Sequence, residues 1–99
     1  MSRPAGATDP AALAVIIPAR DEAEGLRRLI PEVRAAVDGL RRRCEVIVVD
    51  DGSRDATAVV VAEAAACPGP AVRLVRTPPR GQSAAMAAGL AATAAPLVA

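Results

Sequence analysis

The sequence contains no histidine and no aromatic residue, and both absences restrict what the protein can do. Without histidine, nucleophilic catalysis by a Ser-His or Cys-His pair is excluded. Without Phe, Tyr or Trp there is no aromatic platform on which nucleic-acid bases could stack, and the net charge is only +1. These features argue against a nucleic-acid partner.

Cysteine and long apolar runs are scarce as well. Cys44 and Cys67 lie far apart without a Cys-x-x-Cys spacing, so a zinc site is not favoured. We expect two buried free thiols, which are typical of a reducing compartment. No run reaches the roughly 18–20 apolar residues that span a bilayer, and the N-terminus lacks a signal-peptide pattern.

What the chain does contain is an alternation of short apolar runs and helical patterns over 99 residues. After a disordered lead-in over residues 1–12, this order predicts a Rossmann-like α/β fold over 13–99, a parallel three-layer sandwich with right-handed crossovers. We expect strands over 14–17, 45–50, 72–75 and from 96 onward, and helices over about 26–40, 53–66 and 84–94.

Prolines and capping residues mark the expected boundaries. Pro18 should end the first strand, because proline cannot donate a ladder hydrogen bond. Pro31 should either kink the first helix or open a separate helical piece. Ser83 is expected to cap the last helix. The candidate caps of the second helix are Ser53, Asp55 and, more weakly, Thr57.

The first predicted helix is amphipathic. Its expected apolar stripe consists of Leu26, Leu29, Ile30, Val33, Val37 and Leu40. Its expected polar face consists of Arg27, Arg28, Glu32, Arg34 and Arg41. Such a helix buries the stripe against a sheet and leaves the charged face in water.

Two acids follow the most apolar strand. The four β-branched residues 46–49 predict a strand buried on both faces, and Asp50 and Asp51 come directly after it. One acid there is adequately explained as part of a polar turn or as a helix cap. Two adjacent charges at a buried edge repel, which favours a donor-rich ligand or a cation beside them.

Two further polar loops are expected at the same edge, because ligands bind at the carboxyl ends of parallel strands. Asp21 and Glu24 could instead form a simple capping box. The loop around Gly81 could offer backbone N–H groups to a phosphate, or could be an ordinary loop before a helix. Neither a Walker A motif nor GxGxxG after the first strand is present.

Together, in this order, the three loops resemble the family 2 glycosyltransferases. Residues 16–22 stand where the family has a Pro-x-Tyr-Asn-Glu-like motif, and residues 48–55 match Val-Val-Asp-Asp-Gly-Ser-x-Asp without a gap. The third motif is matched by Gly81, Ala85, Gly89 and Leu90. The chain looks most like the polyprenyl-phosphate, or dolichol-phosphate mannose synthase, type. The resemblance implies the N-terminal, nucleotide-binding part of a glycosyltransferase A-type fold, cut within the fourth strand.

The resemblance also implies site residues. Pro18, Arg20 and Glu22 would line the nucleoside pocket, and Val49 would contact the base through its backbone. Asp51 would accept a hydrogen bond from a base N–H. It implies no catalytic residue within this chain.

Activity and partners follow from the same resemblance. The implied enzyme transfers a sugar from a nucleotide-diphosphate donor, with a polyprenyl phosphate at a membrane surface as acceptor. Its divalent metal, Mg or Mn, would be held by an Asp-x-Asp beyond this chain, which we therefore expect to be inactive alone. The implied location is cytoplasmic, with membrane association through the C-terminal part. Two alternatives stay open: a soluble acceptor, or a non-catalytic nucleotide-binding or interaction module.

Overall fold

The computed structural model describes residues 12–40, 42–95 and 97–98. Apart from Ala12, the predicted lead-in lies outside the described residues. Strands and helices alternate along the chain in the order β1 (Leu13–Ala19), α1 (Ala23–Asp38), β2 (Cys44–Asp51), α2 (Thr57–Ala66), β3 (Ala71–Thr77), α3 (Gln82–Ala91) and β4 (Leu97–Val98).

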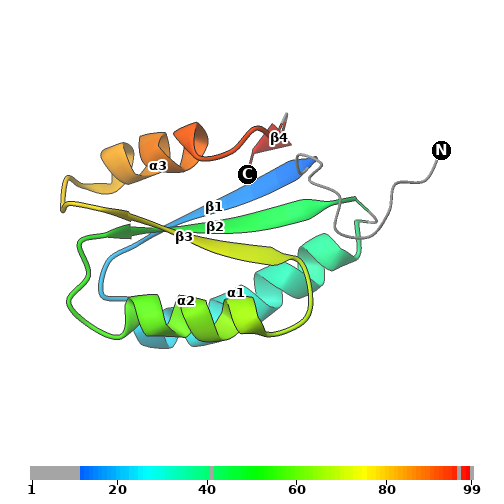
Figure 1. Cartoon of the computed structure of the whole chain (residues 1–99), viewed down its shortest axis with the longest axis horizontal. Coiled ribbons are helices and arrows are strands. Elements are labelled where there is room, and N and C mark those ends of the chain that lie inside the picture. Colours follow the sequence, from blue (N-terminus) through cyan, green and yellow to red (C-terminus); the bar gives the residue numbers. More distant parts are fainter. Residues whose placement is uncertain (1–11, 41, 96, 99) are drawn as a thin grey trace.

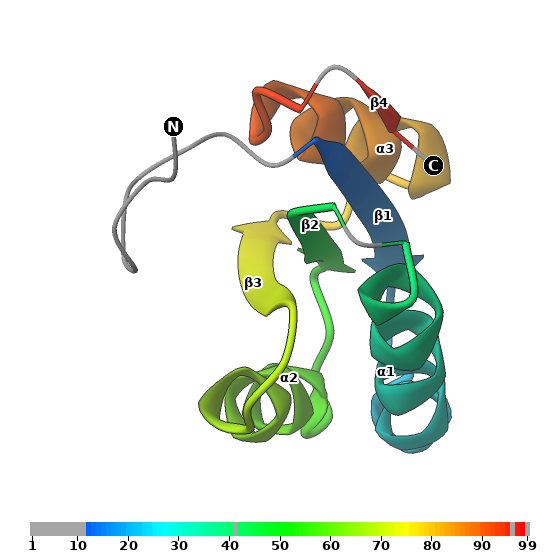
Figure 2. The same cartoon turned by 90° about the vertical axis from the view of Figure 1, so that its right-hand side faces the viewer.

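The described strands form one parallel sheet in the order β3-β2-β1-β4. Helices α1 and α2 cover one face of this sheet and α3 covers the other (Figures 1 and 2). The predicted parallel three-layer sandwich is therefore confirmed. The β1, β2 and β3 arrowheads point to the same edge, where the following helices also begin (Figure 1).

Strand β2 builds a core on each face of the sheet. Val46 and Val48 pack with residues of α1 and α2, whereas Ile47 and Val49 pack with residues of β1 and α3. All four are fully buried. Because successive side chains of a strand point to opposite faces, this β-branched run can fill both cores.

The prediction that Pro18 ends the first strand is wrong by one residue. Strand β1 continues to Ala19, and Pro18 lies in register with Val49 of β2. In the described part of the sheet, β4 pairs only with Leu13 and Ala14 of β1. Pro18 therefore lies beside a partner strand on one side only, and a missing N–H is tolerated there.

Helix α1 runs through Pro31 without a break, so a separate helical piece starting there is excluded. Proline removes one intrahelical hydrogen bond. Leu26, Ile30 and Val37 are at most 4% exposed, and their burial holds the helix against the sheet. The predicted stripe is narrower than expected, because Leu29 is 39% exposed.

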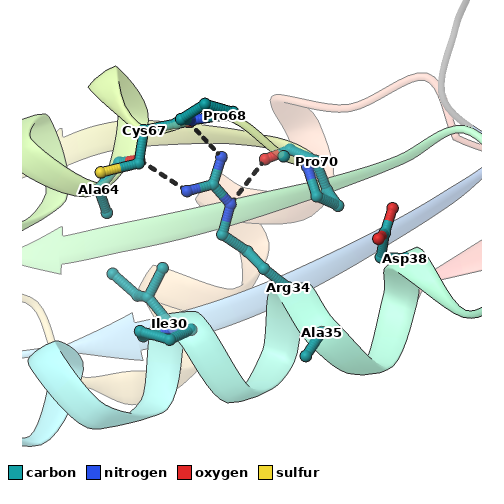
Figure 3. A pocket seen from close by; sticks show the side chains of 10 residues that line it. Ile30, Arg34, Ala35, Asp38, Ala64, Cys67, Pro68 and Pro70 are labelled. Atoms are coloured by element: carbon teal, nitrogen blue, oxygen red, sulfur yellow. Dashed lines mark hydrogen bonds between the residues drawn. The ribbon is translucent and has the colours of Figure 1, made fainter.

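The helical pattern predicted that Arg34 lies on the solvent-facing side of α1, and this prediction is wrong. The Arg34 guanidinium donates to the carbonyl oxygens of Ala64, Cys67 and Pro70 at 2.7, 2.9 and 3.0 Å (Figure 3). These carbonyl groups lie at the C-terminal end of α2 and in the turn before β3. The groove of about 370 Å³ around Arg34 thus lies where β3 begins. Arg41, also expected on that side, lies outside the described residues.

Both cysteines are free, as expected, but they differ in burial. Cys44 is buried in β2, which agrees with the prediction. Cys67 is exposed, so the prediction of a buried thiol is wrong there. It follows Ala66 at the end of α2, where the chain turns toward β3 and leaves the core.

Helix α3 begins at Gln82 and ends at Ala91, earlier at both ends than predicted. Gly81 occupies its N-cap position with φ of 95°, a conformation that favours glycine. Ser83 therefore lies inside the helix rather than capping it. Gly89 is buried against β1 and β2, and a Cβ there would meet Ile16 Cγ2 at 2.5 Å. Glycine thus permits the close approach of α3 to the sheet.

Candidate functional site

A cleft of about 340 Å³ opens at the carboxyl edge of the sheet. It lies between the ends of β1 and β2 and the first turns of α3. Its lining residues are Pro18, Ala19, Arg20, Glu22, Asp51, Gln82 and Ala85. Glu22 and Asp51, which come from different loops, therefore share one concavity, as the loop geometry of a parallel sheet predicts.

The two adjacent acids point to opposite faces of the sheet. Asp50 continues the series of Val46 and Val48 toward α1 and α2, and Asp51 continues the series of Ile47 and Val49 toward α3. Asp50 is 2% exposed and is partnered within the protein: it accepts the Ser53 N–H at 2.8 Å and faces Arg76 at 3.7 Å. The interpretation that both carboxylates have a ligand or a cation as their partner is therefore wrong for Asp50.

Asp51 holds the loop that leads into α3. Its two carboxylate oxygens accept the backbone N–H groups of Arg80 and Gly81 at 2.9 and 3.0 Å. These N–H groups are therefore not available to a phosphate, contrary to one reading of the Gly81 loop. Each carboxylate oxygen has further lone-pair capacity. Asp51 can thus accept another hydrogen bond from a ligand while its orientation stays fixed.

The other predicted site residues differ in their access to the cleft. Arg20 and Glu22 are exposed at its rim, and within the described part of the chain the Glu22 carboxylate makes no hydrogen bond to protein. Pro18 lies at the end of β1 and lines the cleft directly. Val49 is fully buried and is not among the lining residues. A role for Val49 through its backbone stays a prediction.

The loop after β1 is tied to the segment between β2 and α2 by a set of contacts that sequence reasoning missed. Three consecutive residues, 21–23, each donate a backbone N–H to a different side chain of residues 53–57. The pairs are Asp21 N to Ser53 Oγ at 2.8 Å, Glu22 N to Thr57 Oγ1 at 3.3 Å and Ala23 N to Asp55 Oδ2 at 3.2 Å.

Asp21 completes this tie from its own side. Its Oδ1 accepts the N–H groups of Arg54 and Asp55 at 2.7 and 3.2 Å, and its φ of 52° lies in the left-handed region that aspartate tolerates. The predicted capping box with Glu24 is therefore wrong, because the Asp21 carboxylate serves the neighbouring loop. A sequence signal existed: residues 53, 55 and 57 are all capping types, more than one helix start requires.

Asp55 lies one residue before Ala56, the N-cap of α2, and its carboxylate bonds to the first residue of both α1 and α2. Its Oδ1 accepts the N–H of Thr57, the first residue of α2, at 3.0 Å, and its Oδ2 accepts the N–H of Ala23, the first residue of α1. The Thr57 hydroxyl also donates to Oδ1. The hydrogen bond from the Thr57 hydroxyl is the main cause that lowers the pKa of Asp55 below its ordinary value of 3.8. The hydrogen bonds from backbone N–H groups lower it further. Asp55 is thus ionised at neutral pH, when its charge favours both helix N-termini.

The described residues do not provide a metal site of their own. They contain no group of three His, Cys, Asp or Glu side chains that could hold a metal ion. The cleft itself has two carboxylates, Glu22 and Asp51, and Asp51 already accepts two backbone bonds. Within the described residues, the cleft therefore supplies no cluster of side chains that would hold a divalent cation by itself. Separately, none of the described helices is long and apolar enough to cross a membrane.

The family model described as "Glycosyl transferase family 2" matches residues 14–99. The chain belongs to glycosyl transferase family 2. The family resemblance predicted from the three loop motifs is thereby confirmed, and a similar solved structure supports the predicted glycosyltransferase A-type fold.

Two curated relatives of this family 2 chain have names that include a polyprenyl phosphate. One, the undecaprenyl-phosphate 4-deoxy-4-formamido-L-arabinose transferase of Pseudomonas fluorescens (strain Pf0-1), is 38% identical over 78 residues, which cover 78% of this chain and 23% of the relative. The other, the dodecaprenyl-phosphate galacturonate synthase of Rhizobium johnstonii, is 37% identical over 89 residues, covering 86% and 26%. The resemblance to the polyprenyl-phosphate type is confirmed.

A solved structure is similar as well. The mannosyltransferase PcManGT from Pyrobaculum calidifontis, in complex with GDP-Man and Mn²⁺, matches with a TM-score of 0.68 and 28% identity. The match covers 87% of this chain and 25% of the mannosyltransferase. The chain thus spans about a quarter of the length of the relatives and of the structure named here.

Proposed function

We propose that this family 2 chain binds the nucleoside of a nucleotide-diphosphate sugar and is part of an enzyme that transfers the sugar to a polyprenyl phosphate. The observation that carries the proposal is the cleft at the strand ends, which brings Glu22 and Asp51 together. The names of the relatives support a lipid-phosphate acceptor, and the bound GDP-Man of the similar mannosyltransferase supports a nucleotide-sugar donor.

Each lining residue has a proposed part in binding. Asp51, held in place by the Arg80 and Gly81 N–H groups, accepts a hydrogen bond from a base N–H, and a charged acceptor makes such a bond strong. The Arg20 guanidinium stacks on the base. Glu22 accepts hydrogen bonds from the nucleoside.

The rest of the nucleoside pocket is proposed to be apolar. Pro18 supplies the floor where β1 ends. Val49, in register with Pro18, contributes through its backbone. The described residues supply no proton donor or nucleophile for transfer in this proposal; their part is to bind and orient the nucleotide.

The proposal extends to the surroundings of the whole enzyme. A divalent metal, Mg or Mn, would offset the charge of the leaving diphosphate. Its ligands would lie outside the described residues, whose carboxylates do not form such a site. A polyprenyl phosphate resides in a membrane, so the enzyme would work at the cytoplasmic membrane surface.

The first prediction concerns Glu22. Its carboxylate lines the cleft and is not engaged by other described residues, so Glu22→Ala should weaken binding without lowering stability. Loss of one charged hydrogen bond predicts about tenfold weaker binding of UDP or GDP. Isothermal titration calorimetry with both nucleotides measures this. The matched control is Glu32→Ala, an exposed acid elsewhere on α1.

Asp51→Ala provides a contrast in the same experiment. It should weaken nucleotide binding and also lower the free energy of unfolding by about 2 kcal/mol, because two backbone N–H groups lose a charged acceptor. Unchanged affinity in both Glu22→Ala and Asp51→Ala would reject the cleft as the nucleotide site. Binding without any sugar transfer by the full-length protein would favour the non-catalytic module.

A further inference from the structure

We propose that Asp55, which does not line the cleft, is a positioning residue that holds Glu22 in it. This inference rests on the proposed nucleotide site. Glu22 is the residue immediately before α1, and its place in the cleft depends on how that helix begins. Asp55 reaches that point from the other loop by accepting the Ala23 N–H.

The start of α1 has no cap of its own. Glu22 stands at the N-cap position, yet its side chain makes no capping hydrogen bond. The first N–H groups of an α-helix have no partner within the helix and need one from elsewhere. Asp55 supplies it to Ala23 and Thr57 supplies it to Glu22, so the first turn of α1 is secured by the segment before α2 and by the first residue of α2.

Asp55 is the member of this network that joins both loops most directly. One oxygen engages α1 through Ala23, the other engages α2 through Thr57, and its own N–H bonds to Asp21 Oδ1. Thr57, its partner, is fully buried, which fixes the geometry of the pair. Removing the carboxylate would free the first turn of α1, and Glu22 would lose its defined place beside Asp51.

Because Asp55 is not among the residues that line the cleft, its effect on a nucleotide would pass through the residues that it holds. A double-mutant cycle tests this dependence. We expect Asp55→Ala to weaken UDP or GDP binding about tenfold in calorimetry, and the same substitution in a Glu22→Ala background to change binding less than about twofold. Asp38→Ala, an exposed aspartate at the other end of α1, is the matched control.

Asp55→Asn guards against a loss of folding. It keeps the shape and one acceptor oxygen, and it should give a smaller loss with the same dependence on Glu22. If Asp55→Asn leaves affinity unchanged, or if Asp55→Ala costs the same factor in both backgrounds, Asp55 does not act through Glu22 and the inference is overturned.

A second readout separates this inference from the proposed function. Hydrogen–deuterium exchange of the peptide containing residues 20–24 needs no ligand. Exchange there should be faster in Asp55→Asn than in the wild type, with no change in Asp38→Ala. If the wild type binds neither UDP nor GDP, the proposed function fails, and faster exchange would still support the positioning role. Unchanged exchange would overturn it.

Discussion

The two acids that end β2 show how a shift of one residue along a strand changes the surroundings of a side chain. Asp50 and Asp51 are neighbours in sequence, but the alternation of a strand sends Asp50 toward Ser53 and Arg76 and Asp51 toward the cleft. Sequence motifs predicted Asp51 and Glu22 as site residues, and the structure brings these two together.

Other residue-scale features could not be predicted from local patterns. Asp21, Ser53 and Asp55 are common helix-capping types, so their most direct interpretation is a cap on the helix that follows each. Each of them also makes a hydrogen bond to a residue more than thirty positions away along the chain. Such pairings depend on two loops meeting at one edge of the sheet, which only the packed fold specifies.

The lowered pKa of Asp55 leads to a prediction about acid stability. A carboxylate whose pKa is lower in the folded than in the unfolded state adds stability above the unfolded value and loses it as the pH falls through the folded one. The wild type should therefore be more stable than Asp55→Asn by a constant margin from pH 8 to about 5, and the margin should shrink progressively as the pH falls from there through 3.8 and below. Urea unfolding across pH measures it. A margin that closes between pH 7 and 5 would contradict the assignment.

At the scale of elements, the sequence correctly predicted the existence and order of the strands and helices that the structure describes. The boundaries were less so. Helix α1 passes through Pro31 because burial of Leu26, Ile30 and Val37 outweighs one lost hydrogen bond. Arg34 showed no local signal for its three carbonyl contacts, since an arginine on the polar side of a helix usually faces water.

The packing of α3 gives a prediction at this scale. A Cβ at Gly89 would lie 2.5 Å from Ile16 Cγ2 and 3.1 Å from Val49 Cγ2, both on central strands. Overpacking of this kind costs about 1–3 kcal/mol, against about 1 kcal/mol gained in helix propensity. Gly89→Ala should therefore lower the free energy of unfolding by up to about 2 kcal/mol in chemical denaturation.

Gly39→Ala is the matched control for that substitution. Gly39 follows α1 with φ of −68°, and a Cβ there would have its nearest neighbour at 3.6 Å. This variant should be as stable as the wild type or slightly more so. Equal stability of Gly89→Ala and Gly39→Ala would show that α3 does not press on the sheet as described.

At the scale of the whole molecule, the layered fold was predictable because alternating helix and strand patterns leave few arrangements. A doubly buried β2 requires cover on both faces, and right-handed crossovers place α1 and α2 on one side and α3 on the other (Figure 2). The same rule gathers the three motif loops at the carboxyl edge. The size and lining of the cleft depend on side-chain packing and became known only from the structure.

The cleft and the Arg34 groove lie in different parts of the molecule, and we expect only the cleft to bind a nucleotide. The cleft with Glu22 and Asp51 lies at the carboxyl ends of the strands, whereas the groove around Arg34 lies where β3 begins. In the groove, the Arg34 guanidinium is already occupied by three carbonyl oxygens, as Figure 3 shows. A nucleotide should therefore choose the cleft.

The most direct test of this account is hydrogen–deuterium exchange of the full-length protein with and without saturating UDP or GDP. The account predicts that one of these nucleotides slows exchange in the peptides covering residues 18–22, 49–53 and 80–85, and leaves residues 64–70 around the Arg34 groove unchanged. Protection confined to residues 64–70, or none in the three cleft segments although the nucleotide is bound, would contradict it.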